Sequence, residues 1–234
     1  MHFTAAVWGH IAVGSLALVL YWVALLSRKG SLLHRKAGKR SLALLIVVAL
    51  SVGPLLFLRA GPFDPGYVVQ MVYLTVCVAT VSTLAVASIR TKARPDAFRG
   101  RLFRVMGPVL LGLGLLVLVA GVVRHDPVAA VLSWVGLAYG SSMIMFARQR
   151  GPIHPKWWLG WHLNAVCGLF NAVHGTFLHV VSVWAFGLNA TPGTQAWFQL
   201  GTLLAAVALR IGFGQRYGVP LLSWARPARQ MAPV

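Results

Sequence analysis

The stretch GPVLLGLGLLVLVAG, from Gly107 to Gly121, contains no charged side chain and no side chain that can form a hydrogen bond. Arginines flank it at Arg104 and Arg124. About 20 apolar residues are enough for a helix to cross the hydrocarbon core of a bilayer. This stretch therefore predicts a membrane-spanning helix, which we place at residues 102–123.

Six further segments have the same apolar character. The chain has 234 residues, of which 58% are hydrophobic and 10% are charged, whereas about 25% are charged in a typical soluble domain. The seven predicted spans cover residues 3–26, 41–58, 67–89, 102–123, 128–146, 157–186 and 195–213. We expect an all-α polytopic membrane protein with seven transmembrane helices, which form a single helical bundle domain over residues 1–234.

Basic residues are distributed unequally between the connectors. The 21 Lys and Arg residues far outnumber the three Asp, and the formal net charge is +18. Nineteen of them follow spans one, three and five or lie near the C-terminal end, where the set comprises Arg210, Arg216, Arg226 and Arg229. Only Arg59 and Arg124 lie on the other side. Because basic loops stay in the cytoplasm, we expect the N-terminus outside and the C-terminus in the cytoplasm.

The same charge distribution bears on partners and location. Cytoplasmic basic residues attract anionic lipid headgroups, so we expect such lipids at the basic cytoplasmic face. This topological role explains the excess of positive charge without a nucleic-acid partner. We interpret the chain as a multi-pass protein of a bacterial inner (cytoplasmic) membrane.

Polar side chains gather in NAVCGLFNAVHGTFLHV, from Asn164 to Val180. At 100° per residue, one stripe of the sixth span carries Asn164, Gly168, Asn171, Gly175 and Ser182. His174 and His179 lie at its two edges. No Asp or Glu lies within a predicted span, so chemistry there depends on such neutral polar residues. The stripe indicates either helix packing with hydrogen-bonding Asn or a cofactor site.

The histidines favour a cofactor. His10 in span one and His179 in span six are each expected about 10 Å from the outer end of their helix, and His174 roughly 7 Å deeper. Bundle proteins hold haem with His on facing helices. We therefore predict a b-type haem in a redox or electron-transfer protein, which would meet a redox or complex partner protein. The candidate cofactor-binding residues are His10, His174, His179, Asn171, Gly14 and Gly175.

Two alternatives stay open, and whether the chain is an enzyme is not decided. One is a cofactor-free transporter or accessory subunit of a membrane complex, favoured by the lack of any nucleotide-binding or catalytic motif. The other is a zinc hydrolase, because the chain is similar to seven-span hydrolases of the alkaline-ceramidase and adiponectin-receptor type, which bind zinc with three His. The candidate metal ligands are His10, His174, His179 and His162. Two features differ from those hydrolases: His174 and His179 are five residues apart rather than four, and no Asp lies within a span.

An early His10 is followed by a connector with the sequence KGSLLHRKAGKR, from Lys29 to Arg40. This pattern resembles a family of predicted bacterial multi-pass membrane proteins of unknown function, which have an N-terminal His and a Lys-Gly…His-Arg-x-x-Gly connector. The residues that carry the resemblance are His10, Lys29, Gly30, His34, Arg35 and Gly38. It covers only the first 40 residues and implies a role for His10 and His34, but no activity.

Overall fold

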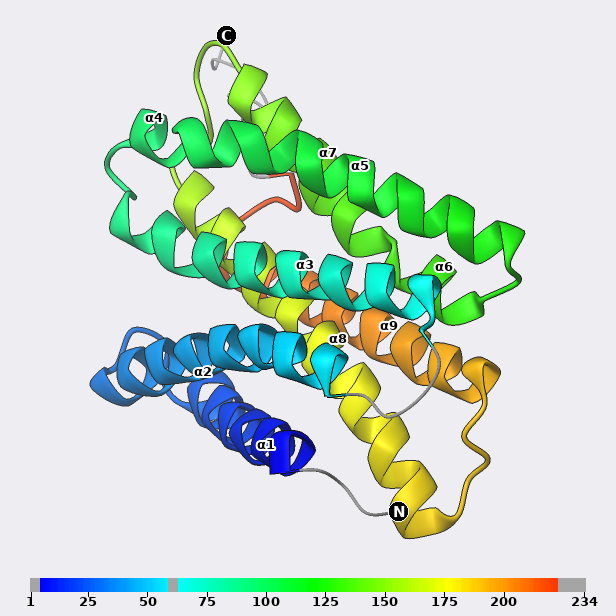
Figure 1. Cartoon of the computed structure of the whole chain (residues 1–234). Coiled ribbons are helices and arrows are strands. Elements are labelled where there is room, and N and C mark those ends of the chain that lie inside the picture. The colour runs from blue at the N-terminus through cyan, green and yellow to red at the C-terminus, as the bar shows by residue number, and fades with distance from the viewer. Residues whose placement is uncertain (1–4, 59–62, 223–234) are drawn as a thin grey trace, which may run out of the picture. The chain divides into compact units, whose positions relative to one another are not determined.

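A computed structural model describes residues 5–58 and 63–222 of the chain. Three of the basic residues used to predict the orientation lie outside these ranges: Arg59, Arg226 and Arg229. The described residues form helices only (Figure 1), and the bounds are α1 Ala5–Leu26, α2 Leu32–Phe57, α3 Pro65–Arg90, α4 Pro95–Phe98, α5 Arg101–Val123, α6 Pro127–Leu132, α7 Trp134–Arg148, α8 Trp157–Phe186 and α9 Pro192–Tyr217.

Seven of these segments are long and apolar enough to cross a membrane, with α6 and α7 together making one of them. This confirms the all-α class and the number of helices that can span a bilayer. The described helices group into two compact units, residues 1–83 and 84–234, and α3 runs from one into the other. The single bundle domain stays a prediction.

Helix α2 begins at Leu32, well before the predicted start at residue 41. The side chain of Ser31 caps the helix by accepting a hydrogen bond from the backbone N–H of His34 at 3.2 Å. Lys, Arg, Leu and Ala, which fill the connector, are good helix formers. The basic connector is therefore mostly helical, and only a short turn joins α1 to α2.

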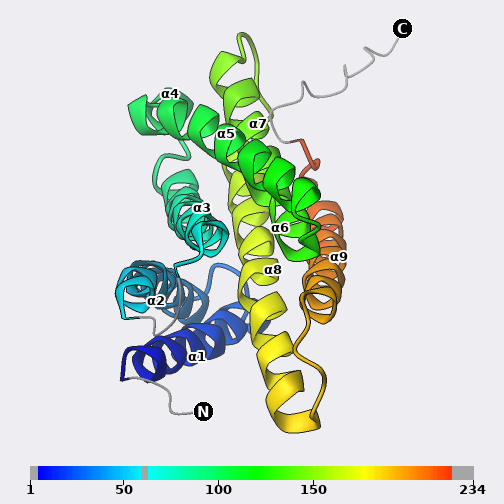
Figure 2. The ribbon, with the colours of Figure 1, turned by 45° about the vertical axis from the view of Figure 1, so that its right-hand side comes forward.

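In the first unit, α1 and α2 lie side by side (Figure 2). Ser41 donates a hydrogen bond to the backbone oxygen of Ala17 at 2.9 Å, and the ring Nδ1 of His10 lies 2.7 Å from Ser51 Oγ. Ser51 Oγ in turn donates to the backbone oxygen of Val48 at 2.7 Å. These polar contacts between otherwise apolar helices fix which faces of α1 and α2 meet.

In the second unit, α5 and α7 pack through glycines. A Cβ atom on Gly136 would lie 2.8 Å from the Cα of Gly114, and one on Gly140 would lie 2.8 Å from the Cα of Leu111. Small residues let helices approach closely in lipid, where packing rather than water exclusion drives association. The glycines of the predicted spans therefore form a helix interface.

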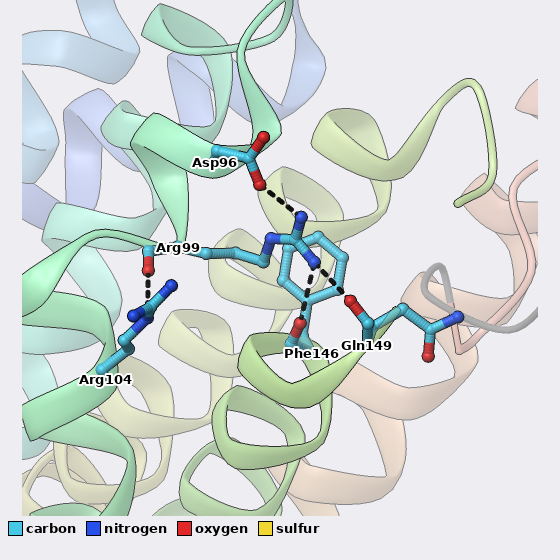
Figure 3. Close-up of polar contacts among 5 residues, drawn as sticks. All are labelled: Asp96, Arg99, Arg104, Phe146 and Gln149. Atoms are coloured by element: carbon cyan, nitrogen blue, oxygen red, sulfur yellow. Dashed lines mark hydrogen bonds and ion pairs between the residues drawn. The ribbon is translucent and has the colours of Figure 1, made fainter. Parts of the chain in front are cut away.

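Arg99 closes one end of this unit, where α5 begins and α7 ends (Figure 3). Its guanidinium pairs with Asp96 at 2.5 Å, donates to the backbone oxygen of Gln149 at 2.8 Å, and lies 5.4 Å from the ring centre of Phe146. The last carbonyls of a helix lack partners within the helix. Arg99 supplies partners for those at the end of α7, so this cation has a structural role.

The glycine interface predicts a difference between two Gly→Ala variants of the same helix pair. Gly140→Ala should lower the free energy of unfolding by about 1–3 kcal/mol because the methyl group overpacks the interface. Gly112→Ala is the matched control, since a Cβ at Gly112 meets no atom within 4 Å. Thermal unfolding of the purified protein in detergent measures both. Equal unfolding midpoints for the two variants would contradict the close α5–α7 approach.

Candidate functional site

A buried polar network joins α7, α8 and α9 around Asn171, which is 1% exposed. The Asn171 amide nitrogen donates to the backbone oxygen of Gln199 and to Thr202 Oγ1, both at 2.8 Å. Its amide oxygen accepts from Trp134 Nε1 at 3.0 Å. Gln199 donates from Nε2 to Thr176 Oγ1 at 3.0 Å. One side chain of α8 thus binds two other helices.

The glycines of the stripe make room for partners from neighbouring helices. A Cβ on Gly175 would overlap the side-chain amide of Gln199, and a Cβ on Gly168 would overlap the Tyr139 hydroxyl. That hydroxyl donates to the backbone oxygen of Asn164 at 2.5 Å. The packing interpretation of the stripe is therefore confirmed: the space beside Gly175 holds Gln199. In the first unit, a Cβ on Gly14 would meet Val48 of α2 at 3.9 Å.

Arg210 lies at the other end of this α8–α9 contact. It is 5% exposed and sits seven residues before the end of α9, about 10 Å along the helix axis. Its Nε donates to Asn164 Oδ1, and its Nη2 donates to the backbone oxygen of Pro220 at 2.7 Å. Nη1 is buried and finds no hydrogen-bond partner among the described residues. It lies against Gly214, where a Cβ would be 2.6 Å away.

No carboxylate neutralises this buried guanidinium within the described ranges. The chain has three acidic residues, and each has a local role elsewhere. Asp64 accepts from the backbone N–H of Gly66 at 2.9 Å, Asp96 pairs with Arg99, and Asp126 caps α6 by accepting from Val128 N at 2.9 Å. The hydrogen-bond acceptors of Arg210 are neutral oxygens. A buried charge is costly unless it is paired, which makes Arg210 a candidate functional residue.

A cavity of about 150 Å³ adjoins Arg210, between α7, α8 and α9. Its walls are mostly apolar, with a few polar groups. The lining residues are Trp134, Ala138, Tyr139, Ser142, Trp161, Asn164, Cys167, Gly168, Leu203, Ala206, Val207, Arg210 and Leu221. An apolar hollow with a small number of placed polar groups is the usual form of a small-molecule site.

The predicted histidine ligands are found in three different settings. His174 is buried, stacks on the Phe170 ring at 4.0 Å between centres, and bonds through Nδ1 to the backbone oxygen of Phe170 at 2.8 Å. His179 is half-buried, and its Nε2 lies 3.4 Å from Thr194 Oγ1. His162 bonds through Nδ1 to the backbone oxygen of Ala85 at 2.9 Å, which joins α8 to the last turns of α3.

His10, the fourth predicted ligand, belongs to residues 1–83, whereas the other three belong to residues 84–234. Over residues 5–58 and 63–222, no three His, Cys, Asp or Glu side chains gather into a group that could hold a metal ion. The haem and zinc ligand sets stay predictions.

Arg210 is the functional candidate that the sequence reasoning missed. It was counted with the basic residues of the cytoplasmic side, although it falls inside the predicted span 195–213. The signal was its spacing: Thr202, Ala206, Arg210 and Gly214 follow one another every four residues and therefore share one face of α9. A cation on a face of small residues inside a span indicates burial against another helix.

The network around Asn171 predicts a loss of stability on truncation. Asn171→Ala removes the side chain that bonds Gln199 O, Thr202 Oγ1 and Trp134 Nε1, and we expect the free energy of unfolding to fall by about 1–3 kcal/mol. Asn189→Ala, in the exposed loop before α9, is the control and should unfold like the wild type. Thermal unfolding in detergent compares the two. If Asn171→Ala unfolds at the same temperature as Asn189→Ala, the network does not hold the helices together.

Comparison of the chain with protein-family models, with curated proteins and with solved structures finds no match in any of the three.

Proposed function

We propose that this chain is a membrane carrier that binds a small organic anion at Arg210, in the cavity between α7, α8 and α9. The observation that supports this is the buried guanidinium, 5% exposed, whose Nη1 has no hydrogen-bond partner among the described residues. Charged residues inside membrane spans are rare and usually serve function. This corresponds to the transporter alternative that the sequence left open.

The chemistry of arginine favours an anion with oxygen atoms. Its planar guanidinium presents donors in a fixed fork, which suits carboxylates. Two donor atoms of this fork, Nε and Nη2, are held by Asn164 and Pro220. Nη1 is the donor without a partner among the described residues, and it is buried against Gly214. The interaction is strong because the surrounding walls are apolar and screen charge weakly.

The orientation of the chain is part of the proposal. Nineteen of 21 basic residues belong to one side by the order of the spans, which supports a cytoplasmic location for that side in a bacterial inner membrane. The end of α9 that carries Arg210 then lies at the cytoplasmic side. The basic face there would bind anionic lipids and raise the local concentration of anionic ligands.

Anion binding at Arg210 predicts stabilisation by a small carboxylate. Sodium propionate, compared with sodium gluconate at equal ionic strength, should raise the unfolding temperature of the wild type, because gluconate is too large and too polar for the cavity. At one hundred times the dissociation constant, the stabilisation is about 2.7 kcal/mol. Arg210→Gln should abolish it. Arg216→Gln, which removes an exposed cation from the same helix, should not. Equal stabilisation in both variants would refute the proposal.

We propose haem binding as a second candidate, supported by the way two histidine rings are held. His174 Nδ1 faces a carbonyl oxygen, so it must carry the proton, and Nε2 carries the lone pair. His10 Nδ1 faces Ser51 Oγ, whose own proton goes to Val48 O, so the same tautomer follows. Ligating histidines are commonly oriented through their other nitrogen in this way.

The haem candidate predicts colour in protein purified from cells supplied with haem. A Soret band that sharpens on reduction with dithionite, with resolved α and β bands, is the expected spectrum. His10→Ala should remove it, whereas His154→Ala, in the loop before α8, should leave it unchanged. A colourless wild-type protein would exclude haem and leave the carrier proposal unaffected.

A further inference from the structure

We propose that the open side of the cavity, between α7 and α9, holds one acyl chain of a phospholipid whose phosphate lies at the basic ends of these two helices. This inference goes beyond the carrier proposed above and does not rest on it, because it concerns the rim of the cavity rather than the partners of Arg210.

Some residues that line the cavity are also exposed on the surface of the structure. They are Ala138 on α7, Val207 on α9 and Leu221 in the turn after α9. Val207 is 45% exposed and Leu221 is 52% exposed. The cavity is therefore a groove with an open side, and the exposed residues of its lining are apolar.

The open side has the length of one leaflet of a bilayer. Ala138 lies ten residues before Arg148, the last residue of α7, and Val207 lies ten residues before Tyr217, the last residue of α9. Ten residues of α-helix span about 15 Å, which is half of a hydrocarbon core of roughly 30 Å. Leu221 follows the end of α9. The groove thus runs from the level of the helix ends to the middle of the membrane.

The bilayer itself supplies an occupant at this depth. The hydrocarbon core holds no water, and an apolar groove left empty would lose the van der Waals contacts of its walls. Within lipid, such packing contacts drive association. An acyl chain is flexible, is as long as one leaflet is thick, and has the same apolar character as the rim of the groove. A lipid chain in this place completes the wall of the cavity.

Exposed cations lie at the end of the groove where the phosphate would lie. Arg148 is the last residue of α7, and Arg216 is the residue before the end of α9. Both are exposed. Cations at the membrane surface attract anionic headgroups, and an arginine can bind two phosphate oxygens at once. The charge at these helix ends therefore fits the phosphate of a lipid whose chain runs between α7 and α9.

Cys167 lies at the inner end of the groove. It lines the cavity and is 4% exposed. Helix α8 starts at the level where α9 ends, because Lys156 Nζ donates a hydrogen bond to the backbone oxygen of Tyr217 at 2.6 Å. Cys167 comes ten residues after Trp157, the first residue of α8, and so lies about 15 Å from that level. A lipid chain in the groove would bring its methyl end to this thiol.

The experiment uses the full-length chain in phosphatidylcholine vesicles with a small share of phosphatidylglycerol that carries a photoreactive diazirine on one acyl chain. Mass spectrometry after illumination measures the labelling of each cysteine. We expect a diazirine near the methyl end to label Cys167, and a diazirine beside the ester to leave it unlabelled. Cys77, 2% exposed and part of the first unit, is the control and should stay at background with both lipids. Labelling of Cys167 no stronger than that of Cys77 would overturn the proposal.

Variants of the rim test where the chain lies. Val207→Trp fills the open side from α9 and should abolish the labelling of Cys167, and Ala138→Trp should do the same from α7. Leu204→Trp is the matched control, since Leu204 is 63% exposed and does not line the cavity. It should leave the labelling unchanged. Full labelling of Cys167 in both rim variants would show that the chain does not lie in the groove.

The placement of the phosphate is tested separately. The double variant Arg148→Gln with Arg216→Gln should lower the labelling of Cys167 by the phosphatidylglycerol probe at least about ten-fold, because both surface cations are lost. The control is Arg101→Gln with Arg104→Gln, which removes two exposed cations from the start of α5. An equal loss of labelling in the two double variants would overturn the placement of the phosphate.

A second copy of the chain is the competing occupant of the open side. In that case Ala138→Cys, in a background without the native cysteines, would form a disulfide between two chains in the vesicles, and the lipid probe would not reach Cys167 in the wild type. This result would overturn the lipid as occupant. It would leave the anion proposed at Arg210 untouched, because the propionate experiment tests that proposal independently.

Discussion

Polar groups inside a bilayer must find their partners within the protein, because lipid offers none. At the contact between α8 and α9, polar side chains of one helix form hydrogen bonds with polar groups of the other. Asn171 bonds Gln199 and Thr202, and Asn164 bonds Arg210. Because both helices present their polar residues on one narrow face, satisfying these groups also fixes how the two helices pack. Helix α7 joins this contact through Trp134, which donates a hydrogen bond to Asn171.

Close approach of the backbones is the second requirement for the site. Gly136 and Gly140 let α7 pack tightly on α5, and Gly168 lets the Tyr139 side chain of α7 reach the backbone of α8. Trp134 of α7 then reaches Asn171. Larger residues at these positions would move α7 away from α8 and open the small cavity into a wide gap. The size of the cavity thus depends on glycines that do not all line it.

The sequence predicts the helices better than their contacts. Apolar runs and basic connectors define the spans, and the 100° period identifies the stripe on α8, because both depend only on neighbouring residues. The predicted span starts at residue 41, whereas α2 already begins at Leu32, because Lys and Arg are good helix formers and a helix can extend beyond its apolar span. The partners of Asn171 could not be predicted, since the pairing of Gln199 and Thr202 with α8 requires the three-dimensional packing. Arg210 was missed for a different reason: its charge already had an explanation in the topology.

Arg210 combines a structural role with the proposed binding role. Its nitrogen atoms differ in their partners. Nε ties the end of α9 to Asn164 on α8, and Nη2 holds the turn that follows α9 through Pro220. A lysine could not divide its donors in this fixed way, since its ammonium group is a single rotating point charge. The arrangement therefore accounts for an arginine at this position, whose hydrogen-bond acceptors among the described residues are neutral oxygens.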